Sequence, residues 1–249
     1  MTGGAPEHSW ARAAALLPGP GYQQHLLGMH VLLRPATYLE IGVAEGDSLH
    51  LARPPTRAFG VDPNPTLNDR PFAATTRVFA MTSDAFFEPA HWARAVGGDT
   101  AIDLAFIDGL HLFEQALRDF INVERHAAPH AVVALHDTLP LSPDAAAREQ
   151  VPGLWCGDTW RILPCLEARR PDLSVTTIPT APSGLTVVTG LDPSSRVLET
   201  HFDAIVAEFL ALPYGWLEAR LQGLIAGHEN SATTLARAIA AGRTGAAAR

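Results

Sequence analysis

Two short segments of the chain bring a carboxylate and an imidazole close together. The first is Asp-Gly-Leu-His at residues 108–111, and the second is the pair His136-Asp137. A histidine beside a carboxylate can act as a general base, because the carboxylate fixes the tautomer of the ring. Two carboxylates can instead hold a divalent cation such as Mg²⁺, which prefers oxygen ligands. The candidate catalytic residues are therefore Asp108, His111, His136 and Asp137, and the candidate metal ligands are Asp108 and Asp137.

A second group of residues suits a cationic nucleoside ligand. Glu40, Gly42 and Gly46 give the pattern E-x-G-x-x-x-G, and Asp62 follows 22 residues after Glu40. The glycines let the backbone turn tightly and approach a ligand. A dinucleotide site would need G-x-G-x-x-G to seat a pyrophosphate, which a carboxylate at position 40 would repel. The acid suits an ammonium and a sulfonium, and Asp62 can accept hydrogen bonds from a ribose diol. The pattern favours S-adenosylmethionine over NAD.

The elements that must position these residues alternate between short apolar strands and longer helices. We expect a helix to begin near Asp47 and Ser48 and another to run from Leu110 to about Ala127. A short connection before the last strand predicts a hairpin, so one terminal strand should be antiparallel. This is an α/β, Rossmann-like fold with a seven-stranded, mostly parallel sheet and helices on both faces. The predicted strands are 38–42, 57–62, 77–81, 102–107, 131–135, 173–178 and 185–189.

The sequence divides into three segments. Residues 1–35 predict an N-terminal helical segment, broken at Pro18–Gly21, that could form a lid or a dimer contact. Residues 36–190 predict the cofactor-binding domain, and residues 191–249 a helical C-terminal extension. The expected partner is a small-molecule acceptor, and a homodimer remains open.

Composition excludes several classes of protein. The net charge of −8 over 249 residues argues against nucleic-acid binding. No apolar stretch approaches the ~20 residues that span a bilayer, so we expect no membrane partner. The N-terminus does not resemble a signal peptide, which predicts a cytoplasmic location with Cys156 and Cys165 as free thiols. The sequence contains no lysine, which excludes Schiff-base chemistry on that residue.

Four segments together resemble successive motifs of class I S-adenosylmethionine-dependent methyltransferases. They are YLEIGVAEGDSL, AFGVDPNP, DLAFIDGLHLFEQALRDF and VVALHDT. They are most similar to the group with a D-G-x-H turn and an H-D pair, which includes macrolide and aminocoumarin sugar O-methyltransferases. Catechol O-methyltransferase is a more distant resemblance. The similarity covers about residues 36–190. It implies that the cofactor-binding residues are Glu40, Gly42, Gly46, Asp62, Thr82, Ser83, Asp84 and Asp108. By the same resemblance, the first three would lie near the methionine part, Asp62 would hold the ribose and residues 82–84 would lie near the adenine.

The resemblance leaves two mechanisms open. Its relatives commonly carry another acid or amide directly after the equivalent of Asp137, whereas this chain has Thr138. Either a divalent metal on Asp108 and Asp137 activates the acceptor, or a histidine takes the proton directly. Simple structural roles compete with both, because Asp108 and Ser83 could cap helices and His136 could be a structural strand-end histidine.

A further segment, Gly157-Asp158-Thr159-Trp160, resembles a recurring G-D-x-W motif of the same group. Here Asp158 is expected to cap the following helix, Trp155 and Trp160 to pack, and residues 150–160 could line the acceptor site.

The predicted function is O-methylation of a small hydroxylated acceptor, such as a sugar or natural-product intermediate. The alternatives are N-methylation, a non-methylating or hydroxylase-like relative, and a NAD-dependent oxidoreductase, which the glycine loop disfavours.

Overall fold

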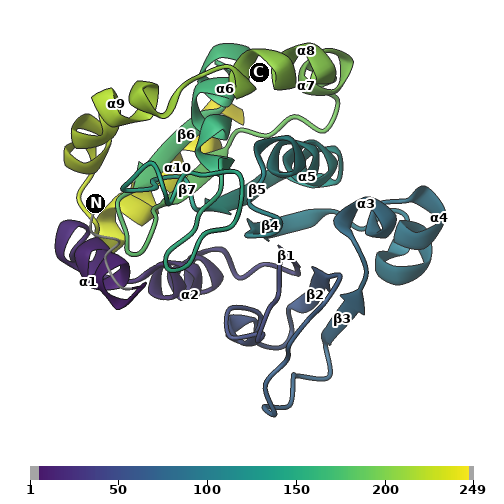
Figure 1. The fold of residues 1–249 in the computed structure, drawn as a ribbon. Helices are drawn as coiled ribbons and strands as arrows, with labels where there is room; N and C mark the ends of the chain where they lie inside the picture. Colours follow the sequence, from purple (N-terminus) through teal and green to yellow (C-terminus); the bar gives the residue numbers. More distant parts are fainter. Residues whose placement is uncertain (1–5, 247–249) are drawn as a thin grey trace.

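The computed structural model describes residues 6–246, which fold around one seven-stranded sheet (Figure 1). The strand order is β3-β2-β1-β4-β5-β7-β6, and β7 runs antiparallel to the other six strands. The Rossmann-like fold and its antiparallel last strand are therefore confirmed. The strands are β1 (Thr37–Ile41), β2 (Arg57–Asp62), β3 (Thr76–Ala80), β4 (Ile102–Ile107), β5 (Ala127–His136), β6 (Ser174–Ile178) and β7 (Leu185–Thr189).

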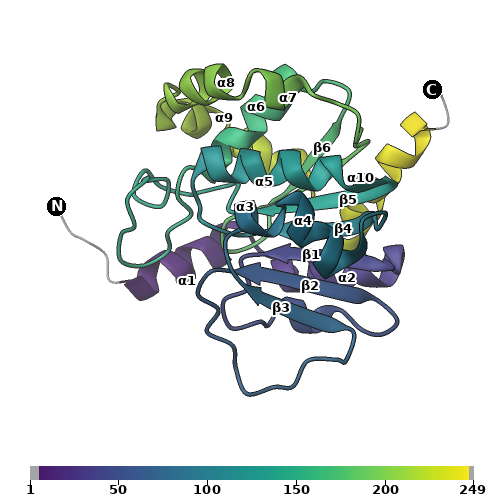
Figure 2. The ribbon, with the colours of Figure 1, turned by 90° about the vertical axis from the view of Figure 1, so that its right-hand side faces the viewer.

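Helices cover both faces of the sheet (Figure 2). Three are short non-α turns: η1 (Leu49–Leu51), η2 (Ala93–Gly97) and η3 (Thr159–Arg161). The α-helices are α1 (Pro6–Leu16), α2 (Tyr22–Leu33), α3 (Ser83–Phe86), α4 (Pro89–Trp92), α5 (Phe113–Arg125), α6 (Ile162–Arg169), α7 (Val197–Thr200), α8 (Phe202–Leu210), α9 (Tyr214–Gly227) and α10 (Ala232–Ala246). None of these helices, within the described part of the chain, is long and apolar enough to cross a membrane.

Alternation along the central strands creates two separate cores. On β1, Leu39 and Ile41 join the core under α5, whereas Tyr38 joins the core under α2 and α10. Successive side chains of a strand point to opposite faces, so Glu40 shares the face of Tyr38. This assigns Glu40 to the α2 side of the sheet. Helix α10 packs on β7, β6 and α2, so both terminal helical segments complete the second core.

The connection from β1 to β2 differs from the prediction. A helix was expected from about Asp47, but only the short turn η1 forms there. Pro54 and Pro55 follow it closely, and neither can donate a backbone hydrogen bond to extend a helix. The chain then enters β2 at Arg57. The part of this connection that can face a ligand is therefore the loop of residues 42–46, here called the glycine loop.

The long segment 139–157 lies against the N-terminal helix α1. Leu154 and Cys156 share a small core with Ala13 of α1 and with Leu17, which directly follows that helix. The backbone N–H of Leu154 also donates to Ser9 Oγ at 3.1 Å. Both elements lie at the same end of the sheet (Figure 2), so they can cover whatever binds there.

Candidate active site

A cavity of about 780 Å³ opens at the carboxyl ends of the parallel strands. This is where α/β folds of this kind bind ligands, and it includes the point between β1 and β4 where the strand order reverses. The volume falls within the range typical of small-molecule sites. Of the predicted site residues, the cavity is lined by Gly42, Asp62, Thr82, Ser83, Asp84, Asp108, His111, His136 and Asp137; Glu40 and Gly46 do not line it.

Gly42 marks the turn after β1 and must be glycine. Its φ is 88°, and a Cβ added there would lie 2.0 Å from the carbonyl oxygen of Asp108. The amide of Asp108 also donates to the carbonyl of Ile41 at 2.8 Å. The ends of β1 and β4 therefore approach so closely that no side chain fits between them. Without a side chain at position 42, the backbone after β1 lines the cavity directly.

Asp62 holds the glycine loop in place. Its Oδ2 accepts hydrogen bonds from the amides of Val43 and Ala44 at 2.9 and 3.0 Å, and its Oδ1 accepts from the amide of Asn64 at 2.7 Å. A carboxylate oxygen has lone pairs for more than one donor. Asp62 can therefore organise the loop and still accept the two hydroxyls of a ribose.

Glu40 lies one layer behind the cavity. It is fully buried, and its oxygens accept hydrogen bonds from Tyr38 Oη at 2.5 Å and Ser48 Oγ at 2.8 Å. Burial raises the pKa of Glu40 to about 8, although these hydrogen bonds oppose the shift. Ser48 lines the cavity, so the acid is linked to it through that hydroxyl. The side chain of Glu40 does not line the cavity, so direct contact between Glu40 and a ligand stays a prediction.

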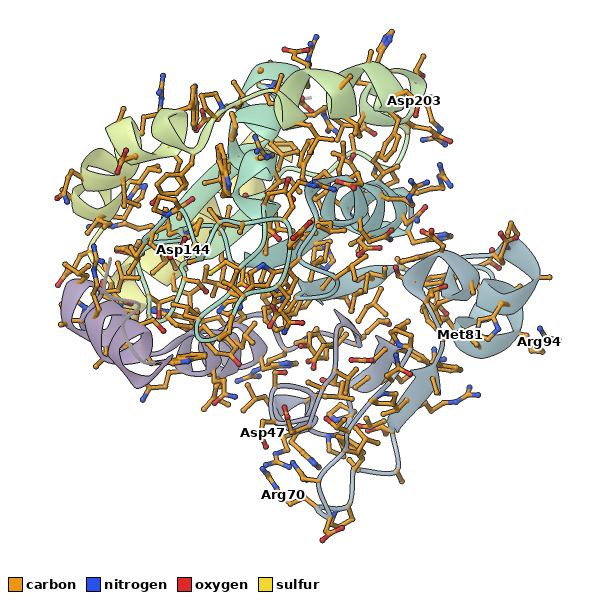
Figure 3. The ribbon with its side chains drawn as sticks, viewed as in Figure 1. Asp47, Arg70, Met81, Arg94, Asp144 and Asp203 are labelled. Atoms are coloured by element: carbon orange, nitrogen blue, oxygen red, sulfur yellow. The ribbon has the colours of Figure 1, made fainter. Side chains whose placement is uncertain are left out.

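Gly46 is also set back from the cavity. Its φ is 85°, and an added Cβ would lie 2.8 Å from the ring of Phe72. Phe72 in turn stacks on His50 at 4.1 Å between ring centroids. Nearby, Asp47 and Arg70 form an exposed ion pair at 3.6 Å, at the outer end of the glycine loop (Figure 3). The glycine thus supports the shape of the loop, and the loop segment carrying Phe72 covers it.

The end of the cavity after β3 carries a polar network that sequence reasoning missed in part. Thr82, and not Ser83, caps α3, because its Oγ1 accepts from the amide of Ala85 at 3.3 Å. Ser83 Oγ instead donates to Asp119 at 2.6 Å, and Gln115 donates to the same carboxylate at 3.0 Å. Burial raises the pKa of Asp119 to about 6. The sequence signal that could have identified Asp119 is its place near the apolar face of the strongly amphipathic helix α5.

The four candidate catalytic residues meet in one cluster. His111 Nε2 lies 3.3 Å from Asp108 Oδ1 and 3.1 Å from Asp137 Oδ2. His136 Nδ1 lies 3.1 Å from Asp108 Oδ1 and 3.4 Å from Asp137 Oδ1. Each imidazole therefore bridges the same two carboxylates. Ser183, just before β7, also donates to Asp137 and fixes its position.

Two residues of this cluster have unusual backbone conformations. His111 and Asp137 have φ values of 61° and 58°, a region that residues with a side chain rarely occupy. Such strain persists only where the surrounding structure enforces it, and it is concentrated at functional sites. Here Gly157 packs on the carbonyl of His111, where a Cβ would lie 1.8 Å away, and the amide of Asp158 donates to that carbonyl at 3.1 Å.

Electrostatics couple the four residues. Burial lowers the pKa of His136, but the facing Asp108 and Asp137 outweigh it and raise that pKa to about 9. Burial also lowers the pKa of His111, but its hydrogen bond to Asp108 and the charges of Asp137 and Asp108 together outweigh burial and raise that pKa. The pKa of Asp108 is lowered, since the two imidazoles together outweigh the cost of its burial. These pKa shifts favour protonated imidazoles beside an ionised Asp108.

Three of these residues could also hold a metal ion. The ligand atoms of Asp108, His111 and Asp137 all lie within 4.8 Å of one another. One of the three is a nitrogen, which suits a transition metal better than Mg²⁺. Thr138 cannot add an oxygen, because it is fully buried and accepts a hydrogen bond from Thr186 at 2.9 Å.

The other wall of the cavity comes from elements far away in the sequence. The ring of Tyr22 on α2 lies 4.3 Å from that of His136, and the ring of Trp155 lies 5.1 Å from that of His111. Trp10 on α1 lines the cavity too. Burial, followed by the nearby Asp108, raises the pKa of Tyr22 to about 12. The sequence predicted a covering segment at each place, but gave no signal for Tyr22 as a partner of His136.

Asp158 has a different role from the one expected. It was predicted to cap the helix that follows it, but its side chain makes no such bond. Its Oδ1 accepts from the amide of Phe113 at 2.9 Å, at the start of α5, and its Oδ2 pairs with Arg148 and Arg161 at 2.6 and 3.0 Å. The fully buried carboxylate therefore ties the 139–157 segment to the helix that follows His111. Trp160 packs as expected, and both cysteines are free and buried.

Comparisons with known proteins agree with this architecture. Residues 39–138 match a family model described as a methyltransferase domain. No curated protein sequence gives a significant match. The cofactor-bound structure of Rv0187 from MTB is similar at 18% identity and a TM-score of 0.50, covering 76% of this chain and 91% of that one.

Two further similar structures are O-methyltransferases. TomG from Streptomyces achromogenes, involved in tomaymycin synthesis and solved with SAM, is 18% identical, with 72% and 88% of the chains covered and a TM-score of 0.48. An O-methyltransferase from Bacillus cereus in complex with SAH is 17% identical, with 73% and 89% covered and a TM-score of 0.48. At such identities the likeness is one of fold.

Proposed function

We propose that this chain transfers a methyl group from S-adenosylmethionine to a hydroxyl of a small molecule, since residues 39–138 match a family model described as a methyltransferase domain. One observation carries the proposal. A single cavity joins the loop that Asp62 holds to the cluster around His111. Methyl donor and proton acceptor therefore share one space.

The proposed cofactor position follows from the polar groups on that side. Asp62 accepts the ribose hydroxyls, and the network of Ser83, Asp84 and Asp119 faces the adenine. The methionine part lies along Gly42 and Ser48, with Glu40 behind. Nothing on this side favours a pyrophosphate, because Asp62 faces the cavity and Glu40 lies just behind Ser48.

The proposed reaction needs alignment and a base. The sulfonium already activates its methyl group, so the protein must place the acceptor oxygen in line with the sulfur–methyl bond. His111 Nε2 takes the proton of the acceptor hydroxyl, and the oxygen forms a bond to the methyl carbon. The carbon–sulfur bond breaks at the same time, and its electron pair stays on sulfur, which gives neutral S-adenosylhomocysteine.

Asp108 and Asp137 support the base in two ways. They hold the imidazole of His111 at 3.3 and 3.1 Å, which fixes its orientation, and they stabilise the imidazolium that forms. A bound sulfonium beside the ring favours the uncharged imidazole that a base requires. The His111 Nδ1 atom is buried without a hydrogen-bond partner, which leaves Nε2 as the nitrogen for proton exchange.

A divalent cation held by Asp108, His111 and Asp137 would lower the pKa of the acceptor hydroxyl. We propose that the histidine route suffices, since both carboxylates already have imidazole partners and Thr138 adds no ligand.

Calorimetry tests the cofactor assignment directly. S-adenosylhomocysteine should bind one-to-one, and NAD at the same concentration should give no heat beyond dilution. Binding of NAD in its place would overturn the proposal. Incubation with S-adenosylmethionine and hydroxylated small molecules, followed by detection of S-adenosylhomocysteine, then tests the transfer.

A further inference from the structure

Among the described residues, the acceptor side of the cavity is lined by aromatic rings and by no cationic side chain beyond the two histidines. Tyr22 and Trp155 flank the catalytic cluster, Trp10 lies at the rim, and Leu154 and Pro182 add apolar surface. The Trp155 ring is fixed, because its Nε1 donates to the carbonyl of Ala147 at 2.7 Å. A fixed indole beside a base offers a ready surface for a flat ring.

Acidic side chains dominate the lining of the cavity. Seven carboxylate side chains line the cavity, and no arginine lies among the described residues that do so. The chain has no lysine. Nearby arginines are already paired: Arg148 binds Glu114 and Asp158, and Arg161 binds Asp158 and two backbone carbonyls. Within the described part of the chain, the cationic side chains near the reacting hydroxyl are thus the two histidines, and both already face Asp108 and Asp137.

Arginines on the cofactor side are engaged in the same way. Arg70 pairs with Asp47 at 3.6 Å, and Arg118 lies 3.8 Å from Asp84. Proteins commonly bind phosphates and carboxylates through arginine or lysine side chains, because these groups donate directed, charge-assisted hydrogen bonds to the anion. Without them, burial of an anion beside Asp108 and Asp137 would add like-charge repulsion to its desolvation.

We propose that the acceptor is an uncharged or cationic compound whose reacting hydroxyl sits on a flat aromatic ring stacked on Trp155. Acceptors with a phosphate, nucleotide or carboxylate beside that hydroxyl are excluded. This inference rests on the proposed methyl transfer, and it names the acceptor class for the same site.

Three matched phenols test the charge rule. Tyramine is cationic, 4-methylphenol is neutral and 4-hydroxyphenylacetate is anionic, while the hydroxyl and ring stay the same. Their dissociation constants are measured by ligand-observed NMR on the full chain saturated with S-adenosylhomocysteine. We expect the anion to bind at least about tenfold more weakly than the neutral phenol. Equal or tighter binding of the anion, or no binding of any of the three, would overturn the inference.

Two substitutions sharpen the test. Gln150 lines the cavity at its exposed rim, so Gln150→Arg should strengthen binding of 4-hydroxyphenylacetate at least about fivefold and leave 4-methylphenol unchanged. Gln222→Arg makes the same change on the exposed surface of α9, away from the cavity, and should alter neither. If both variants behave alike, the charge of the cavity does not select the acceptor.

Trp155 carries the ring part of the proposal. Trp155→Leu should weaken all three phenols about tenfold, while Trp155→Phe keeps most of the affinity because it keeps a flat ring. Titration of the same variants with S-adenosylhomocysteine separates a failure of the proposed function from a failure of the proposed acceptor class. A protein that fails to bind this cofactor product refutes the proposed function, whereas a protein that binds it but prefers the anionic phenol refutes only the acceptor class.

Discussion

The cofactor side and the acceptor side of the cavity are built differently. On the cofactor side, Asp62 and Gly42 stand at strand ends, and backbone hydrogen bonds within the sheet and its loops hold them. On the acceptor side, Tyr22 and Trp155 come from α2 and from the 139–157 segment, and their rings approach the two histidines of the cluster through side-chain packing. In the reaction we propose, the sheet positions the reacting groups, while the covering segments select the acceptor. Replacements on the two sides should therefore separate catalysis and acceptor selection from cofactor binding.

The largest separation is expected at His111. His111→Ala removes the base, so kcat should fall by about 10²–10⁴-fold. The affinity for S-adenosylhomocysteine should stay within about twofold, since the ring does not hold the loop around Asp62. Steady-state kinetics and calorimetry measure the two effects. His130→Ala, at an exposed position on β5, serves as the control. An equal loss of cofactor affinity would show that the two sides are not separable at this residue.

The opposite separation is expected at Asp62. Asp62→Ala removes an acceptor for the ribose and releases the loop amides of Val43 and Ala44. The dissociation constant for S-adenosylhomocysteine should rise by about 10–100-fold, from the loss of charge-assisted hydrogen bonds. Asp69→Ala, in the exposed loop between β2 and β3, gives the matched control. Unchanged affinity would place the ribose elsewhere.

A smaller effect concerns Glu40 and the pH dependence of stability. Its pKa in the folded protein is about 8, above the ordinary value of 4.5, so the folded state favours the protonated acid. The stability it contributes is present at low pH and is lost as pH rises from about 4.5 to 8, on the order of a few kcal/mol. Urea unfolding of the cofactor-free protein at pH 5.5 and 8 should therefore show a smaller decrease in Glu40→Gln than in the wild type.

Glu167→Gln, at an exposed position on α6, is the control for that experiment and should follow the wild type. Parallel pH profiles for wild type and Glu40→Gln would mean that Glu40 ionises normally, contrary to its enclosure by Tyr38 and Ser48.

The smallest expected effect is that of a chelator. If His111 is sufficient as the base, EDTA followed by dialysis should change kcat by less than about twofold. Loss of activity that Mg²⁺ or Mn²⁺ restores would assign Asp108, His111 and Asp137 to a metal ion. The acceptor side would then depend on an added cation and not on the protein alone.

The same contrast explains what the sequence could predict. Strand alternation and glycine spacing depend on neighbours in the chain, so the sheet, Gly42 and the gathering of Asp108 with Asp137 at one edge followed from local patterns. The enclosure of Glu40 did not follow from local patterns. It depends on a hydrogen bond from Ser48, which precedes the short turn η1 where the sequence predicts a helix. The roles of Asp158 and Tyr22 were equally hidden, since their partners Phe113 and His136 lie far away in the sequence.

A crystal structure with S-adenosylhomocysteine bound tests the central claim most directly. We expect the ribose on Asp62, the adenine beside residues 82–84, and the sulfur facing the space between His111 and Trp155. A ligand whose sulfur points away from His111, or whose ribose avoids Asp62, would contradict it.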